Sequence, residues 1–408
     1  MKNIFLVLSL FTGSLFGQDL SQVKKDLEKL TSEEFAGRGY VKEGIQNAAN
    51  YLEERLKEIE VETVERQSFE ILVNTFPRNS SLKLGPGRLK EGKDYILDPR
   101  SSGFQGKGTA RFVAADTILS GRPIALQEGE IPIVDADRFK SPEEITLFRE
   151  FLISRVEVGP IILLREKLTW SVGQREYPFP IIEVDRSLVT DEVDGSTIWI
   201  NTFSEEKNIE MENVIGKIKG HRSDSTIVFT AHYDHLGMMG NAMFPGASDN
   251  ATGTSMTLDL AKYYSKTTPE FDTYFVFFAA EEAGLKGSKY MVTNPAFDLS
   301  RVKFLINLDL MGSAEKGITV VNGKQHRTQM NRMSMINQEQ NLVPKIKLRG
   351  NTPNSDHYWF AESGVPAIFI YTEGNITAYH DVYDVSEGID WANYEEVFTL
   401  IVEFTKTL

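Results

Sequence analysis

Four apolar stretches in the second half of the chain each lead to residues that bind metals or transfer protons. Continuous β-branched and aromatic stretches of this length are typical of strands buried on both faces of a mostly parallel sheet. They are Thr226–Ala231 before His232, Thr273–Ala280 before Glu281 and Glu282, Val302–Leu308 before Asp309, and Ala367–Tyr371 before Tyr379 and His380. Because ligands bind beyond the carboxyl ends of strands in such sheets, we expect these side chains to gather at one edge. The sequence therefore predicts a metal site there.

Length, charge and cysteine content narrow the class of protein. The 408 residues allow a catalytic domain and a smaller second domain. The net charge is −14, and no Lys/Arg block is present, so nucleic acid is not an expected partner, because phosphate binding needs a positive face. The chain has no cysteine, which excludes disulfides, thiolate ligands and a cysteine nucleophile.

The first residues have the pattern of a secretory signal peptide. A positively charged region at Met1–Asn3 precedes an apolar stretch at Ile4–Phe16, and the small residue Gly17 follows where cleavage is expected. The stretch is too short for a comfortable membrane span. We therefore expect a signal peptide over residues 1–17 and a secreted or periplasmic protein without membrane association after its removal. The absence of cysteine excludes a lipoprotein anchor and fits a bacterial periplasm or exterior.

The spacing of apolar residues changes twice along the chain. Residues 18–70 carry apolar positions at helical spacing and predict two N-terminal helices of the catalytic domain. Residues 71–205 have short apolar stretches between Gly, Pro and Asp, which predicts a β-rich insertion with one helix near Glu143–Arg155. Within it, Gly103–Gly108 is interpreted as a turn.

From residue 206 to 408 strands alternate with helices, which favours an α/β domain. The helices are expected at 253–266, 285–292, 325–338, 355–363 and 394–405. The predicted fold is thus α/β, with a mixed, mostly parallel central sheet flanked by helices and a β-rich inserted domain.

The residues at the predicted sheet edge include candidate metal ligands, a residue that orients a ligand, and a candidate general base. Asp234, two positions after His232, can accept the ring N–H of that histidine and fix its tautomer. Asp249 lies in a glycine-flanked loop that can aim its carboxylate at a metal, although it could instead cap the next helix. Glu281 and Glu282 are adjacent, so their side chains diverge. One can bind metal while the other holds a water, as general-base hydrolysis requires.

The motifs HYDHLG, PGASDNATG, AAEEAGLKGS, NLDLMG, NSDHYWF and YHDVYD together resemble the co-catalytic zinc aminopeptidases of metallopeptidase family twenty-eight. That family also contains glutamate carboxypeptidase II and the glutaminyl cyclases. The resemblance covers about residues 19–70 and 206–408, and includes the stretch Leu30–Arg38. It implies a zinc exopeptidase-like fold and a peptide substrate.

The resemblance also implies a role for each site residue. One of two zinc ions would be held by His232 and Asp309 and the other by Glu282 and His380, with Asp249 bridging both. Glu281 would be the general base, Tyr379 an oxyanion donor and Asp234 the partner that orients His232. A cis peptide is expected between Asp249 and Asn250.

Several alternatives stay open at this point. A glutaminyl cyclase would use a single zinc on the same fold. A carboxypeptidase would place arginines near the site, and only Arg349 stands near a catalytic motif in the sequence. A non-catalytic relative would have lost ligands, whereas every ligand position here is filled. Residues 71–205 occupy the place of a protease-associated domain but match it poorly, so a lid and a divergent scaffold are both possible. The sequence does not determine the oligomeric state.

Overall fold

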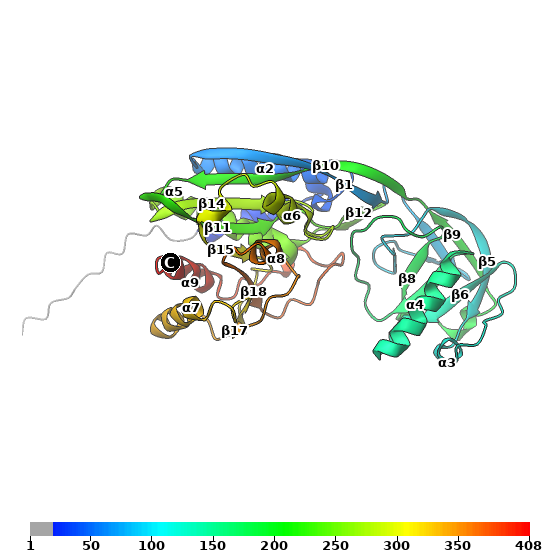
Figure 1. The fold of residues 1–408 in the computed structure, drawn as a ribbon. Coiled ribbons are helices and arrows are strands. Elements are labelled where there is room, and N and C mark those ends of the chain that lie inside the picture. Colours follow the sequence, from blue (N-terminus) through cyan, green and yellow to red (C-terminus); the bar gives the residue numbers. More distant parts are fainter. Residues whose placement is uncertain (1–18) are drawn as a thin grey trace, which may run out of the picture.

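The structure, a computed structural model, describes residues 19–408, so the predicted signal peptide at 1–17 lies outside the described residues. Two lobes lie side by side, each built on an eight-stranded sheet (Figure 1). The larger lobe contains the predicted metal site. The boundaries proposed for the domains stay a prediction, although the second sheet falls within residues 81–202.

The sheet of the larger lobe has the strand order β1-β10-β14-β11-β15-β18-β16-β17. Its four central strands, β14, β11, β15 and β18, pair in parallel, while β1, β10 and β16 join through antiparallel pairs. The strand bounds are β1 Thr63–Thr75, β10 Glu205–Ile218, β11 Arg222–His232, β14 Phe271–Phe278, β15 Val302–Leu308, β16 Gly317–Val321, β17 Ile346–Leu348 and β18 Ala367–Glu373. The predicted α/β class with a mixed central sheet is confirmed.

Helices cover both faces of this sheet, because alternate strand residues point to opposite sides. Phe275 and Phe277 pack with the core under α1, α2, α5, α7 and α9, whereas Val276 and Phe278 pack with α6 and α8. The bounds are α1 Leu20–Leu30, α2 Gly44–Ile59, α5 Thr252–Lys266, α6 Lys286–Thr293, α7 Arg327–Gln340, α8 His357–Glu362 and α9 Tyr394–Thr405. The helices predicted from residue 253 onward are thus α5 to α9, with ends that differ by one or two residues at most.

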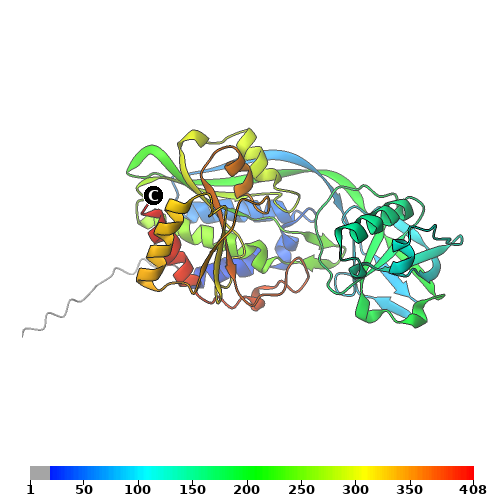
Figure 2. The same ribbon diagram turned by 60° about the horizontal axis from the view of Figure 1, so that its bottom comes forward.

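The smaller lobe is formed by the second sheet, in the order β3-β2-β9-β5-β6-β7-β8-β4. Strands β5 to β8 pair in parallel, and α4 lies on this sheet (Figure 2). The bounds are β2 Ser81–Leu84, β3 Gly87–Leu89, β4 Tyr95–Leu97, β5 Phe104–Phe112, α3 Ala115–Leu119, β6 Glu130–Asp135, α4 Pro142–Val156, β7 Ile161–Arg165, β8 Ile181–Asp185 and β9 Thr197–Thr202.

The turn predicted at Gly103–Gly108 is wrong, because most of this stretch belongs to strand β5. Its glycines allow close packing: a Cβ on Gly108 would lie 2.4 Å from the carbonyl oxygen of Gly129. Glycine in a strand can mark such a close approach as well as a turn.

A long ribbon joins the lobes. Strands β1 and β10 pair without a break from Thr63 and Lys217 to Thr75 and Glu205, and run from the larger lobe toward the smaller one (Figure 1). A short hairpin, β12 Gly237–Met239 with β13 Ala242–Phe244, extends from the larger lobe into the core of the smaller one. Aromatic residues of both lobes therefore share one core.

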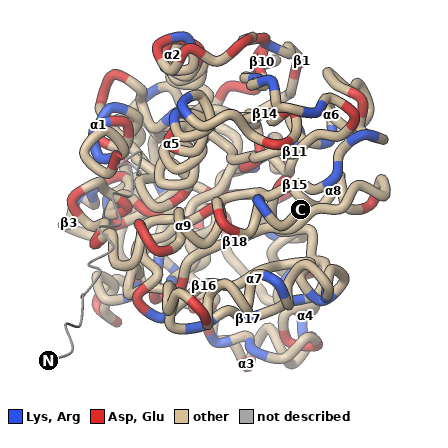
Figure 3. Tube along the Cα trace, turned by 90° about the vertical axis from the view of Figure 1, so that its left-hand side faces the viewer, with Lys and Arg blue, Asp and Glu red and all other residues tan. Residues whose placement is uncertain are grey.

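Acidic and basic residues are interspersed along the chain trace, without a block of one sign (Figure 3). Over residues 19–408, no helix combines the length and the apolar character that crossing a membrane requires.

Candidate metal centre

The predicted site residues meet at the carboxyl ends of the four parallel strands. His232 is the last residue of β11, and Asp309 directly follows β15. Glu281 and Glu282 follow β14, and His380 lies on the loop after β18. This is the position expected for a ligand site in an open α/β sheet.

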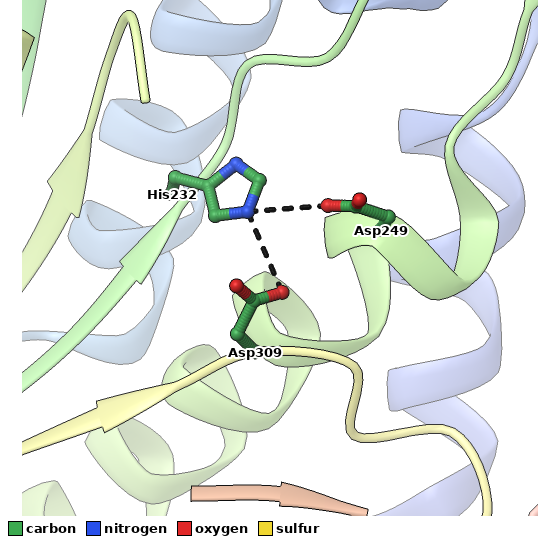
Figure 4. A group of neighbouring side chains, drawn as sticks. All are labelled: His232, Asp249 and Asp309. Atoms are coloured by element: carbon green, nitrogen blue, oxygen red, sulfur yellow. Dashed lines mark ion pairs between the residues drawn. The ribbon is translucent and has the colours of Figure 1, made fainter. Parts of the chain in front are cut away.

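A first group consists of His232, Asp249 and Asp309 (Figure 4). The Nε2 atom of His232 lies 3.2 Å from Asp249 Oδ1 and 3.4 Å from Asp309 Oδ1. The three side chains are buried. His232 Nε2 and Asp309 Oδ1 make no hydrogen bond among the described residues, so two buried polar atoms face one another without a hydrogen-bond partner. Such convergence of unpartnered donor atoms is what a metal ion would resolve.

A second group surrounds the other oxygen of Asp249. His380 Nε2 lies 3.0 Å from Asp249 Oδ2 and 3.3 Å from Glu282 Oε2. On its other oxygen, Glu282 contacts His235 Nδ1 at 2.8 Å. Asp249 is therefore the residue common to both groups, with one carboxylate oxygen toward each.

The loop that carries Asp249 is held by main-chain contacts. The peptide between Asp249 and Asn250 is cis, as predicted. The backbone N–H groups of Ser248 and Asp249 donate to the carboxylate of Asp384, at 2.8 and 3.1 Å. Gly246 precedes them with a φ of +60°, and a Cβ there would lie 2.4 Å from the ring of His235. Only glycine fits this position, which places Asp249 beside the histidines.

Asp309 is oriented by a chain of buried hydrogen bonds. Ser355 Oγ donates to Asp309 Oδ2 at 3.1 Å, and Asn307 Nδ2 donates to Ser355 Oγ at 2.7 Å. Thr230 on β11 donates in turn to Asn307 Oδ1. One oxygen of Asp309 is thus occupied, and the other is left facing His232.

Asp234 holds the site in a different way from the prediction. The ring Nδ1 of His232 lies 3.1 Å from the backbone carbonyl oxygen of Asp234, while the carboxylate is 3.8 Å away. That carboxylate instead accepts the backbone N–H groups of Glu281 and Glu282, at 3.1 and 3.3 Å, and the hydroxyl of Tyr40. Asp234 therefore orients His232 through its carbonyl and fixes the Glu281–Glu282 pair through its side chain.

Glu281 differs from the ligand candidates. Its carboxylate makes no hydrogen bond or ion pair within residues 19–408, although it lies close enough to His232 to raise the pKa of that ring. Burial raises the pKa of Glu281 well above its usual range, and the nearby Glu282 and Asp356 add to this rise. A half-buried, unpaired carboxyl beside the two groups is suited to accept a proton.

The neighbouring carboxylates raise the pKa of the two histidines and so favour their protonated form. Burial opposes protonation of His380, but the carboxylates of Glu282 and Asp249 raise its pKa to about 11. Burial also opposes protonation of His232, but Asp309 and Glu281 raise its pKa well above the usual range. Burial alone would raise the pKa of Asp249, yet His232 and His380 hold it well below its usual range. The cluster therefore favours positive charge at its centre.

Tyr379 stacks on the ring of His380, with centroids 4.0 Å apart and planes 11° apart. Its side chain is 44% exposed, so it borders the site rather than filling the core. Burial and the nearby Asp249 raise its pKa, so the phenol keeps its proton and can donate a hydrogen bond.

Residues 213–405 match the sequence model of Peptidase family M28. The match begins in β10 and ends in α9, so it includes both groups and Glu281. Residues 213–405 of the chain therefore belong to peptidase family M28.

Curated relatives match the chain over a limited stretch. Aminopeptidase YwaD of Bacillus subtilis is 32% identical over 122 residues, which are 29% of this chain and 25% of that protein. An aminopeptidase of Pseudomonas aeruginosa is 30% identical over 118 residues, 29% of this chain and 21% of that protein. The chain thus matches a quarter or less of the length of these relatives.

Solved structures resemble the chain over almost its whole length. A zinc aminopeptidase from Bacillus subtilis has a TM-score of 0.70 at 17% identity and covers 95% of this chain and 94% of its own. An aminopeptidase from Aneurinibacillus sp. strain AM-1 has a TM-score of 0.65 at 19% identity, covering 96% and 93%. At these identities the likeness establishes the fold.

The donor set of this M28 site fits zinc. Zinc binds imidazole nitrogen and carboxylate oxygen, and both kinds converge here. His232 Nε2, His235 Nε2 and Asp309 Oδ1 are buried and lack a hydrogen-bond partner among the described residues. Buried carboxylates also need a compensating cation.

Sequence reasoning missed three residues of the M28 site. His235 contacts Glu282, Asp384 holds the Asp249 loop, and Arg38 is fully buried beside that loop. The guanidinium of Arg38 donates to the carbonyls of Tyr233, Pro245 and Gly246. All three lie within the quoted motifs or the stretch Leu30–Arg38, so their positions could be read from the sequence although their contacts could not.

Proposed function

We propose that the protein is a zinc-dependent aminopeptidase that removes N-terminal residues from peptides. The observation that carries this proposal is the position of Asp249, whose two oxygens face two separate groups of ligand atoms beside the unpaired Glu281. A single-zinc cyclase needs only one such group. The relatives described as aminopeptidases support the same conclusion.

In this proposal His232 and Asp309 would hold one zinc ion, Glu282 and His380 would hold the other, and Asp249 would be a ligand in both groups. His235 keeps Glu282 in place through its Nδ1 contact of 2.8 Å. Two bound zinc ions would polarise the scissile carbonyl and lower the pKa of a shared water.

The chain's own residues then handle protons and charge. Glu281 takes a proton from the attacking water and passes it to the nitrogen of the leaving peptide, because its carboxyl is half-buried, unpaired and close to His232. Tyr379 keeps its proton and donates a hydrogen bond to the oxyanion that forms on the attacked carbonyl.

The charges around the site favour a substrate with a free amino terminus over one with a free carboxylate. Four carboxylates, those of Asp249, Glu281, Glu282 and Asp309, attract an ammonium group. A terminal carboxylate would need a free arginine, but the guanidinium of Arg38 is used by backbone carbonyls. That of Arg349 donates to the hydroxyl of Tyr371.

A cavity of about 550 Å³ offers space for the remainder of the peptide. Its lining includes Ala283, which directly follows Glu282, and Lys286 at the start of α6. Residues of β1 and Arg100 of the smaller lobe also line it. Contributions from both lobes support a peptide bound between them.

Hydrolysis of a panel of aminoacyl anilides tests the proposal. We expect activity with free aminoacyl anilides, loss of that activity after chelation, and recovery when zinc is added. The matched control is the same panel with acetylated amino groups, which we expect to be inert. Activity that resists chelation, or equal cleavage of the acetylated panel, would overturn the proposal. Cyclisation of N-terminal glutamine without anilide hydrolysis would identify a cyclase instead.

We further propose that the protein is exported, on the basis of the positive and apolar pattern of residues 1–17. Amino-terminal sequencing of the protein from the native cell tests this. A mature protein that begins near residue 18 is expected, and one that retains Met1 in the cytoplasm would contradict it.

A further inference from the structure

A segment of the smaller lobe lies against the loop that carries His380. This segment, residues 167–173, is called the strap below. It belongs to the connection between β7 and β8, and thus to the predicted insertion. The strap and His380 are about two hundred positions apart in the sequence, with Trp170 and His380 separated by 210.

The strap contacts His380 twice through its backbone. The ring Nδ1 of His380 lies 3.0 Å from the carbonyl oxygen of Trp170. In the other direction, the backbone N–H of Trp170 donates to the carbonyl oxygen of His380 at 2.9 Å. The first contact places the proton on Nδ1 and leaves Nε2, which faces Asp249 and Glu282, free to bind a metal.

The side chain of Trp170 anchors the strap in the core shared by the lobes. Its ring is 5% exposed and packs against Phe76 and Phe244, with centroids 6.0 and 4.5 Å away. Its Nε1–H donates to the carbonyl of Leu97 at 2.9 Å. Farther along the strap, the carbonyl of Gly173 accepts the backbone N–H of Asn74. The carbonyl that holds His380 is therefore attached to rigid surroundings.

Lys167, at the other end of the strap, contacts residues before and after His380 in the sequence. Its Nζ donates to the carbonyl of Thr377 at 2.9 Å and lies 3.4 Å from Asp381 Oδ2. Its side chain is 49% exposed, so this contact can be removed without opening the core.

The two histidines of the centre are held differently. His232 ends a buried strand and takes its Nδ1 partner from Asp234, two positions along the same chain segment. His380 lies on a loop whose neighbouring Thr377 and Tyr379 are exposed, and its Nδ1 partner comes from the other lobe. Within residues 19–408, the smaller lobe thus supplies a hydrogen-bond partner to His380 of the second group, and to neither His232 nor Asp309 of the first.

We infer that the strap is a positioning element for His380, so that the smaller lobe completes one of the two metal sites. This inference rests on the proposed two-zinc centre. It also assigns the insertion a fixed structural role in the metal centre. Partners of this kind, which contact a ligand rather than the metal, change metal affinity about 10–100-fold when removed.

Zinc titration against a competing chelator tests the inference on the full chain. The wild type is expected to bind two zinc ions. Trp170→Ala is expected to keep one tight site and to weaken the other about 10–100-fold, and Lys167→Ala to weaken the same site about tenfold. Trp170→Phe and Lys167→Arg should restore most of the affinity, because they keep the packing and the positive charge respectively.

Phe139→Ala is the matched control. Phe139 is buried in the smaller lobe and stacks on Phe148, in a core cluster that excludes the strap. Its loss should lower the melting temperature without changing zinc affinity. Equal zinc affinity in Lys167→Ala and the wild type, or equal weakening by Phe139→Ala, would overturn the inference. A wild type that binds no zinc would instead refute the proposed function. If Trp170→Ala does not fold, the zinc affinity of Lys167→Ala tests the inference, because the side chain of Lys167 is exposed.

Discussion

The carboxylate oxygen Oδ2 of Asp249 lies 3.0 Å from Nε2 of His380, although the two residues are 131 positions apart. The other oxygen, Oδ1, lies 3.2 Å from Nε2 of His232. One side chain thus joins two groups of ligand atoms from different strand ends. The buried position of Asp249 is maintained by Asp384 and by Gly246, neither of which belongs to either group.

Substitution of Asp249 by alanine is expected to abolish binding of both metal ions, because each group loses an oxygen that faces it. Metal analysis after dialysis gives the measurement, with two zinc ions per chain expected in the wild type. Asp224→Ala is the control, since Asp224 is an exposed carboxylate paired with Arg222. Retention of a full zinc complement in Asp249→Ala would show that Asp249 is not a ligand.

Glu281→Gln is expected to keep both zinc ions and to lower kcat about 10²–10⁴-fold, because it removes the proton acceptor and keeps the shape of the side chain. Glu282→Gln, one residue on, should instead lose zinc, since Glu282 contacts His380 and His235. Steady-state kinetics with metal analysis separate the two variants. Wild-type kcat in Glu281→Gln would remove this residue from the mechanism.

Arg38→Met is expected to destabilise the larger lobe by about 3 kcal/mol or more. The change leaves several buried carbonyls without a donor, among them those of Tyr233, Pro245 and Gly246. Denaturant unfolding measures the loss, and zinc affinity should fall with it because these carbonyls flank His232 and Asp249. The control is Arg88→Met at an exposed arginine of the smaller lobe. A stable Arg38→Met protein would mean that water replaces the guanidinium.

Asp259 gives a pH dependence that is separate from the metal centre. Burial raises its pKa to about 6, while the backbone N–H of Asp19 and the charge of Lys262 act in the opposite direction. In the unfolded chain this carboxyl has a pKa near 3.9, so between pH 4 and 6 the folded state binds more protons than the unfolded state. Its contribution to stability is therefore fully present below about pH 4 and is lost as the pH rises through 6.

Comparison of Asp259→Asn with the wild type isolates this contribution. The variant should gain about 2 kcal/mol of stability relative to the wild type between pH 4 and 7, because asparagine does not ionise. Denaturant unfolding at both pH values checks it. A difference between variant and wild type that stays constant with pH would contradict the raised pKa.

The arrangement of the parallel strands could be predicted from sequence because it depends on local patterns. The stretches before His232, Glu281 and Asp309 are continuous and apolar, so their burial and their common edge follow from strand geometry. The same holds for α9, whose bounds agree with the prediction at both ends. The meeting of His232, Asp249 and Asp309 was expected from these strand ends and from the motif resemblance.

Contacts that depend on backbone atoms or on the other lobe could not be predicted in this way. The carbonyl of Asp234, rather than its carboxylate, contacts His232, and a carbonyl carries no sequence signature. The contact of Trp170 with His380 joins two segments whose sequences show no relation. Gly108 shows why a glycine is ambiguous in sequence: a turn favours it for its freedom of φ, whereas here close packing between strands requires the absence of a Cβ.

X-ray diffraction from zinc-loaded crystals, recorded at the zinc absorption edge, shows how many zinc ions bind and which side chains hold them. We expect two anomalous peaks that share the carboxylate of Asp249, one contacted by His232 and Asp309 and the other by Glu282 and His380. A single peak, or a peak away from Asp249, would contradict it.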